Sequence, residues 1–157
     1  MTTVGYVTVA EADEYICTRY LSIDDLRRAW EFSDESDKIV YLQRSSDAIN
    51  ALPLAGRKSD CSQENAFPRW PSATVPTVVK WAQIENALSL ADASAREDEA
   101  FYDKMWKYGV ESYRIGNLSE SSSAGSWGRS GATFSGITSA RAVKFLQPYL
   151  QGGFTIE

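Results

Sequence analysis

The 157-residue sequence contains no histidine. Histidine is the commonest general base and the commonest protein metal ligand. Its absence excludes Ser-His-Asp and Cys-His catalytic arrangements within one chain. The sequence also lacks a Walker A loop and a GxGxxG dinucleotide motif. We therefore expect no enzymatic activity, no cofactor and no metal site, with catalysis by paired carboxylates from distant positions left as the open alternative.

Cysteines and long apolar runs are also scarce. Cys17 and Cys61 are the only cysteines and form no CxxC pattern, so two free thiols in a reducing cytosol are favoured over a disulfide. The first residues lack the basic region and apolar run of a secretory signal. No apolar stretch approaches the ~20 residues that span a bilayer. We expect no contact with a membrane.

The overall composition is that of a globular protein with an acidic surface. Hydrophobic residues make up 43% and charged residues 24%, and the length fits one domain over residues 1–157. The net charge of −5 disfavours general binding to phosphate backbones and suits a surface that DNA passes without sticking. Five Trp, eight Tyr and six Phe exceed the needs of a compact core, so we expect some of them at interfaces.

Apolar periodicity predicts a mainly α fold, a helical bundle of four to six helices. Thr8 and Glu11 form a capping box that starts the first helix. The predicted helices cover about 9–20, a short stretch from Ser22, 33 to Pro53, 76–94, 95–108 as a continuation or a separate helix, and 138–150. Tyr113 and Ile115 alternate with polar residues before Gly116-Asn117, which predicts a short strand or hairpin near 110–122.

Two of these helices carry explicit packing predictions. The second helix is expected to bury one face and to pair Asp24 with Arg28 on the other. The third is expected to pair Asp34 with Lys38. The predicted buried stripes are Ile23, Leu26 and Trp30 on the second helix and Ile39, Leu42, Ile49 and Leu52 on the third.

A long Pro-containing loop over residues 54–74 is the most informative segment. Its prolines stiffen a stretch predicted to expose large aromatic and cationic side chains to a partner. The candidate interface residues are Arg57, Lys58, Phe67, Arg69 and Trp70. The alternative is that the cations pair with Asp60 and Glu64, each pair contributing less than about 1 kcal/mol.

Two further segments supply candidate contacts. Residues 119–136 are rich in Ser and Gly and predict a flexible loop that either orders on binding or is a linker. Residues 151–157 form a C-terminal tail. The aromatic and apolar residues in these segments complete the predicted partner interface: Trp127, Phe134, Phe154 and Ile156.

Taken together, these segments resemble the small head–tail connector proteins (adaptor or head-completion proteins) of tailed bacteriophages. That resemblance includes the group labelled as having a DnaT-like single-stranded-DNA-binding domain. It covers nearly the whole chain, except that the Ser/Gly segment is longer than expected. The matching pieces are Tyr6 to Tyr15, Ala48 to Leu52, Gly56-Arg57, Phe67-Pro68-Arg69, Val75-Pro76 with Val79, Ala82, Glu85, Ala87 and Leu88, then Val110 to Leu118 and Thr138 to Leu150.

The resemblance implies a structural virion protein at the head–tail interface, assembled in the host cytoplasm. It implies a homo-oligomeric ring of about twelve copies, built by a repeated heterologous interface beneath the portal. The implied partners are other copies of the chain, the portal protein, a downstream tail or neck protein, and genomic DNA that passes through the lumen without sequence-specific binding. A tail-completion protein further down the neck is a related alternative.

A different alternative is a single-stranded-DNA-binding protein of the primosomal DnaT type. Trp70, Tyr113 and Trp127 are available to stack on bases. The acidic balance and the absence of a Lys/Arg stripe argue against an electrostatic groove. A connector is therefore the first expectation and a DNA-binding protein the second.

Overall fold

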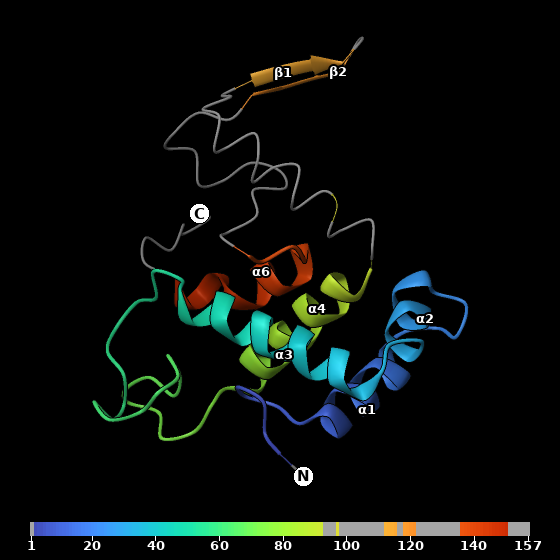
Figure 1. The fold of residues 1–157 in the computed structure, drawn as a ribbon. Helices are drawn as coiled ribbons and strands as arrows, with labels where there is room; N and C mark the ends of the chain where they lie inside the picture. The colour runs from blue at the N-terminus through green and yellow to red at the C-terminus, as the bar shows by residue number, and fades with distance from the viewer. Residues whose placement is uncertain (1, 93–96, 98–111, 116–117, 122–135, 151–157) are drawn as a thin grey trace.

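The computed structural model describes residues 2–92, 97, 112–115, 118–121 and 136–150 (Figure 1). It is mainly helical, which confirms the predicted bundle of four to six helices. The elements are α1 (Val9–Arg19), α2 (Asp25–Glu31), α3 (Glu35–Asn50), α4 (Thr77–Ala91), β1 (Ser112–Ile115), β2 (Leu118–Ser121), α6 (Ala140–Leu146) and the 3-10 helix η1 (Gln147–Tyr149).

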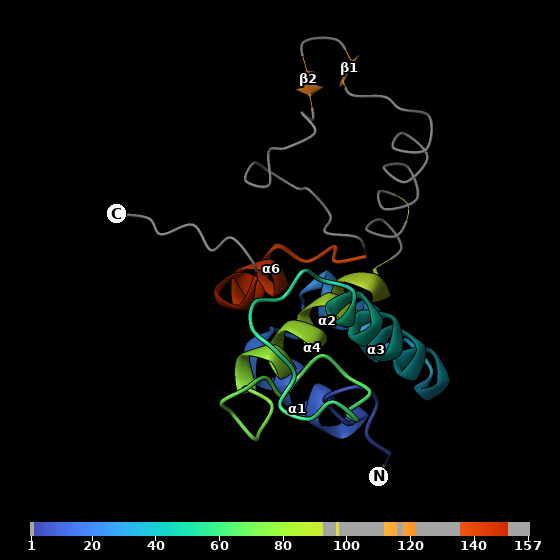
Figure 2. The same ribbon diagram turned by 90° about the vertical axis from the view of Figure 1, so that its left-hand side faces the viewer.

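Helix α4 is the centre of the bundle. It contacts α1, α2, α3 and α6, and it lies between α3 and α6 in Figures 1 and 2. A helix that is surrounded on all sides buries residues around its whole circumference. The apolar ones are Val79, Ala82, Ile84, Ala87, Leu88, Leu90 and Ala91. This explains why the sequence of α4 is apolar beyond a single stripe.

The helix ends follow the local signals. The Glu11 backbone N–H donates to Thr8 Oγ1 (3.2 Å), and the Thr8 N–H donates to Glu11 Oε2 (2.7 Å), which confirms the capping box. Ser139 caps α6, where its side chain accepts from the Ala142 N–H (3.3 Å). Pro148 lies in η1, so the predicted last helix changes to a 3-10 turn at Gln147.

Two predictions of buried residues were wrong. Ile23 is 76% exposed and Ile39 is 40% exposed, whereas Trp30 and Leu42 are buried. Ile23 precedes α2, which begins only at Asp25, so helical spacing does not apply to it. Ile39 lies at the edge of α3, outside the stripe that packs on α4.

Both predicted ion pairs within helices were also replaced. Arg28 lies 4.0 Å from Asp25, while Asp24 accepts a hydrogen bond from the Leu21 N–H (2.8 Å) as it leads into α2. Lys38 bonds to Asp13 of α1 (3.1 Å). Asp13 also accepts from the buried Trp30 indole (2.7 Å), so this carboxylate lies at the junction of α1, α2 and α3. A tertiary partner thus replaced the predicted one for Lys38, and a different residue of the same helix replaced it for Arg28.

Polar side chains of α4 fasten the beginning of the described chain. The Tyr6 N–H donates to Gln83 Oε1 (2.9 Å), and Gln83 Nε2 donates to the carbonyls of Val4 (2.8 Å) and Leu42 (2.9 Å). Gly5 has φ +65°, and a Cβ there would lie 2.4 Å from Ser46 Cβ. The turn before α1 therefore packs directly on α3 and α4.

One helical turn further on, α4 fastens the last helical segment. Asn86 Nδ2 donates to the Gly136 carbonyl (3.1 Å), and Asn86 Oδ1 accepts from the Thr138 N–H (2.8 Å). Ile137 between them is buried in the core. Among the described residues, every buried side-chain nitrogen and oxygen has a hydrogen-bond partner. The polar residues of α4 thus join segments that are far apart in the sequence.

The predicted hairpin is present as well. Strands β1 and β2 pair antiparallel, with Ile115 opposite Leu118 (Figure 1). The helix predicted over 95–108, most of the Ser/Gly segment and the tail 151–157 lie outside the described residues. None of the helices in the described part of the chain combines the length and the apolar character needed to cross a membrane.

Candidate functional site

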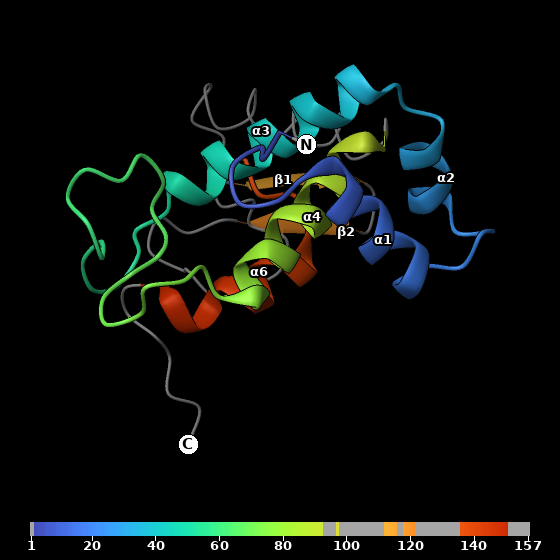
Figure 3. The ribbon, with the colours of Figure 1, turned by 90° about the horizontal axis from the view of Figure 1, so that it is seen from below.

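The loop of residues 54–74 projects to one side of the helices (Figures 1 and 3) and is attached to the bundle at its base. The Ala55 N–H donates to the Tyr149 carbonyl (2.7 Å). Phe67 is only 2% exposed and meets Tyr149 edge-to-face, with ring centroids 5.2 Å apart. Phe67 also meets Tyr6 at 6.1 Å. The prediction that Phe67 is exposed to a partner was wrong, because this ring anchors the loop in the core.

Asn50, the last residue of α3, holds the loop from a second direction. Its Oδ1 accepts from the Ala66 N–H (2.8 Å) and from the Tyr6 hydroxyl. Its Nδ2 donates to Asn65 Oδ1 (3.0 Å). Burial raises the pKa of Tyr6 to about 12, so its hydroxyl stays protonated above the pH near 10 at which a free tyrosine ionises. Sequence analysis missed Asn50, because nothing local distinguishes it from any polar residue at a helix end.

Arg69 stabilises the loop from inside. Its Nε donates to the Ala55 carbonyl (2.7 Å), and its terminal nitrogens donate to the carbonyls of Leu54 (3.4 Å), Gly56 and Ala66 (3.3 Å). The side chain is half-buried. A guanidinium that satisfies four carbonyls has few donors left for a partner. Arg69 was predicted as a contact residue, and the structure makes it a positioning residue.

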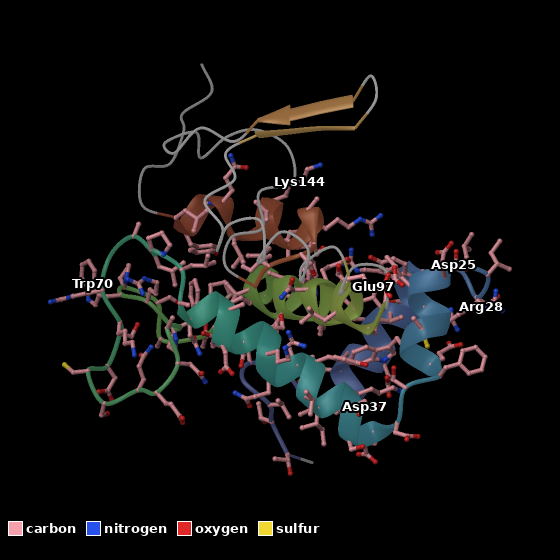
Figure 4. The ribbon with its side chains drawn as sticks, turned by 45° about the horizontal axis from the view of Figure 1, so that its top comes forward. Asp25, Arg28, Asp37, Trp70, Glu97 and Lys144 are labelled. Carbon is pink, nitrogen blue, oxygen red and sulfur yellow. The ribbon has the colours of Figure 1, made fainter. Side chains whose placement is uncertain are left out.

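Two backbone hydrogen bonds across the loop place Arg57 and Trp70 side by side at what we call its tip. The Trp70 N–H donates to the Arg57 carbonyl (3.0 Å), and the Ser59 N–H donates to the Pro68 carbonyl (3.1 Å). The Arg57 Cζ lies 5.1 Å from the centroid of the Trp70 ring. Trp70 is 61% exposed and points away from the helices (Figure 4). An exposed indole beside an exposed guanidinium can stack on a planar group and bind an anion.

The charges of the loop do not neutralise one another. Lys58 is exposed and its Nζ donates to the carbonyls of Gln63 (3.1 Å) and Glu64 (3.2 Å). Asp60 accepts from the N–H and the hydroxyl of Ser62, which lowers its pKa. Within the described residues, no ion pair joins Arg57, Lys58 or Arg69 to Asp60 or Glu64. The structure therefore does not support the alternative in which the loop cations pair with Asp60 and Glu64.

Helix α4 also carries a buried carboxylate, Glu85. Glu85 is 3% exposed and accepts from the hydroxyls of Tyr15 (2.8 Å) and Tyr20 (2.5 Å). Arg141 of α6 lies 3.7 Å from it. Burial and the neighbouring Glu85 raise the pKa of both tyrosines. Each oxygen of Glu85 accepts from one tyrosine, so this buried carboxylate links the end of α1 to α4 and α6.

The other predicted interface residues lie outside the described part: Trp127, Phe134, Phe154 and Ile156. Cys17 and Cys61 are exposed free thiols. Across the described residues, no three Cys, Asp or Glu side chains are grouped so that they could hold a metal ion. Arg57, Lys58 and Trp70 are thus the predicted interface residues that the structure brings together at the surface.

The family comparison identifies the kind of protein to which this geometry belongs. A family model described as "Putative DnaT-like ssDNA binding protein" matches residues 4–155. The chain belongs to this family. No curated protein and no solved structure matches the chain. The match spans the loop, the central helix α4 and the last helical segment.

Membership of the DnaT-like family corrects the sequence analysis. The head–tail connector interpretation was wrong, because the matching family is a DNA-binding one and not a connector family. The portal, tail and ring assignments lose their support with it. The second reading of the sequence, a DNA-binding protein of the DnaT type, is the one that the family favours. The virion localisation and the absence of catalysis stay predictions.

Proposed function

We propose that this DnaT-like protein binds single-stranded DNA without catalysing a reaction, and that Arg57 and Trp70 contact the strand. The family description names that ligand. The observation that carries the proposal is the exposed Trp70 ring with the Arg57 guanidinium 5.1 Å from its centroid. Proteins that bind single strands combine aromatic platforms for bases with cations for phosphates.

The rigidity of the loop supports this role. Phe67, Arg69 and Asn50 fix the loop on the bundle, so little conformational freedom is lost when a strand binds at its tip. A preorganised tip offers the indole face and the cation in one arrangement. Sequence-independent stacking suits it, because every base has a π-face.

The acidic net charge does not contradict the proposal, because the acids are unevenly distributed. Residues 9–37 carry nine carboxylates and three arginines, whereas the loop of residues 54–74 carries Arg57, Lys58 and Arg69 against Asp60 and Glu64. Debye screening confines exposed charges to about 8–10 Å at physiological salt. A strand at the loop therefore senses the charges of the loop, in which cations are in excess, more than those of the acidic helices.

The test is a titration of a fluorescently labelled oligo-dT by anisotropy at several salt concentrations. Trp70→Ala should lose about 1–3 kcal/mol of binding free energy, the value of one stacked base. Arg57→Gln should reduce the slope of log K against log salt by about 0.7, the value of one phosphate contact on a single strand. Both side chains are exposed, so the fold should tolerate both changes.

Two variants make the result specific. Trp70→Phe keeps an aromatic face and should retain most of the affinity. Arg28→Gln removes one exposed positive charge from α2 and should leave binding unchanged. The proposal fails if the wild-type protein shows no salt-dependent binding to oligo-dT. The assignment to the loop fails if the wild type binds and the Trp70 and Arg57 variants bind equally well.

A further inference from the structure

A second group of aromatic and cationic side chains lies where α1, α4 and α6 meet. Trp81 of α4 packs against Phe145 of α6, with centroids 5.9 Å apart, and against Tyr15 of α1 at 6.1 Å. Trp81 and Phe145 are half-buried, so part of each ring reaches the surface. We use the name three-helix face for the surface that these rings form together with Arg19, Tyr20, Arg141 and Lys144.

Arg19 lies over two of the rings of this face. Its Cζ lies 4.3 Å from the Trp81 centroid and 4.7 Å from the Tyr15 centroid. The side chain is nevertheless exposed, at the C-terminal end of α1. Both rings thus contact the guanidinium of a side chain that remains exposed to solvent. Unpaired bases stack on guanidinium planes as they do on aromatic rings.

Arg141 is ordered in a comparable way on α6. Its Nη1 donates to the Tyr20 hydroxyl (3.0 Å), and its Cζ lies 5.3 Å from the centroid of the Tyr20 ring. The buried Glu85 attracts it from 3.7 Å. The Arg141 side chain is still 62% exposed. Two arginines are therefore fixed in position while much of each remains open to solvent.

The local charge of the face differs from that of the whole chain. Residues 136–150 carry Arg141 and Lys144 and no carboxylate. Lys144 is exposed, one turn along α6 from Arg141, and points away from the bundle (Figure 4). Glu11 on α1 is paired with Lys80 of α4 (3.0 Å). Glu85 is buried beneath the face and engaged by two tyrosines. The exposed cations of the face are positioned to meet an anion.

We infer that the three-helix face is a second binding surface for single-stranded DNA, in which Arg19, Arg141 and Lys144 contact phosphates and a base stacks on the Arg19–Trp81 pair. The inference rests on the proposed function and extends it to a surface built by three helices, separate from the loop. Cations held by rings lose less side-chain freedom on binding than free ones do. Nothing in the linear sequence predicts this surface, because its residues come from three distant segments.

The experiment repeats the oligo-dT titration with Arg19→Gln, Lys144→Gln and the double variant. Each single change should lower the slope of log K against log salt by about 0.7, and the double variant by about 1.4. Arg19→Lys should keep the slope and still lose affinity, because an ammonium cannot offer a planar stacking surface. Arg28→Gln is the matched control, with the same loss of charge on another helix. Thermal unfolding of each variant checks the fold.

The outcomes separate this inference from the proposed function. If the wild type does not bind, the proposed function fails and the inference fails with it. A different outcome is that the wild type binds and Trp70→Ala weakens binding. If the Arg19 and Lys144 variants then bind as Arg28→Gln does, the three-helix face alone is refuted. If the Arg19 and Lys144 variants lose slope and affinity while remaining folded, the second surface stands.

Discussion

Arg69 decides the geometry of the loop more than any other residue. It was predicted as a cation for a partner, and it instead bonds to four carbonyls of the loop that contains it. The sequence pattern singled out the loop, with Arg57 and Trp70 in it, because prolines, aromatics and cations can be recognised from the sequence alone. It could not assign roles within the loop, since the direction of a side chain depends on contacts across the fold.

Arg69→Lys tests that role while conserving the charge. A lysine has no planar fork with which to reach four carbonyls. We expect a loss of about 1–3 kcal/mol of stability, because hydrogen bonds from a charged donor are lost, two of them in partly buried surroundings. We also expect weaker oligo-dT binding with an unchanged salt slope, because the loop is misplaced and no phosphate contact is lost. Unchanged stability and unchanged affinity in Arg69→Lys would instead show that Arg69 does not position the loop.

At the scale of the elements, helix caps and helix-ending prolines could be predicted from the sequence, whereas the ion pairs between helices could not. Thr8 and Glu11 form the box that their spacing predicts, because both partners lie within one turn. Lys38 shows the opposite case, since Asp13 of another helix replaced the neighbouring Asp34. The same limit hid the three-helix face. Elements follow from local sequence, whereas the surfaces between them follow from packing.

The turn that leads into α1 offers a test at this scale with its own matched control. Gly5 and Gly56 both have positive φ, +65° and +76°. A Cβ at Gly5 would meet Ser46 Cβ at 2.4 Å, whereas a Cβ at Gly56 would meet nothing within 4 Å. Gly56→Ala should cost about 1–2 kcal/mol for the left-handed backbone alone.

Gly5→Ala carries the same backbone cost and adds the collision with α3. Urea unfolding should therefore show a clearly larger loss of stability for Gly5→Ala than for Gly56→Ala. The difference between the two measures how tightly the turn packs on α3. Similar losses in the two variants would contradict that close packing.

At the scale of the whole molecule, stability should depend on pH in the alkaline range. Burial raises the pKa of Tyr6 to about 12, and it raises the pKa of Tyr15 and Tyr20, with Glu85 adding to the effect. In the unfolded chain these hydroxyls ionise near pH 10. Above about pH 10 the unfolded state therefore binds fewer protons than the folded state, so stability falls as the pH rises.

We expect the free energy of unfolding to show no pH dependence from these tyrosines near neutral pH and to decline from about pH 10 toward pH 12. Each tyrosine can contribute a slope of at most about 1.4 kcal/mol per pH unit. Tyr6→Phe should be less stable at pH 7, because it loses the bond to Asn50, and should decline less steeply. A wild-type curve that stays flat up to pH 11.5 would disprove the burial of these hydroxyls.

The two amide side chains of α4 carry a consequence for biosynthesis. Gln83 needs carbonyls near residue 4, and Asn86 needs the backbone of residues 136–138. A nascent chain that has left the ribosome only as far as α4 can satisfy the first requirement and not the second. An unpaired amide disfavours burial, so α4 should dock fully only after residue 138 emerges. The domain is thereby expected to close late in translation, and a stalled chain ending before that point should stay sensitive to protease.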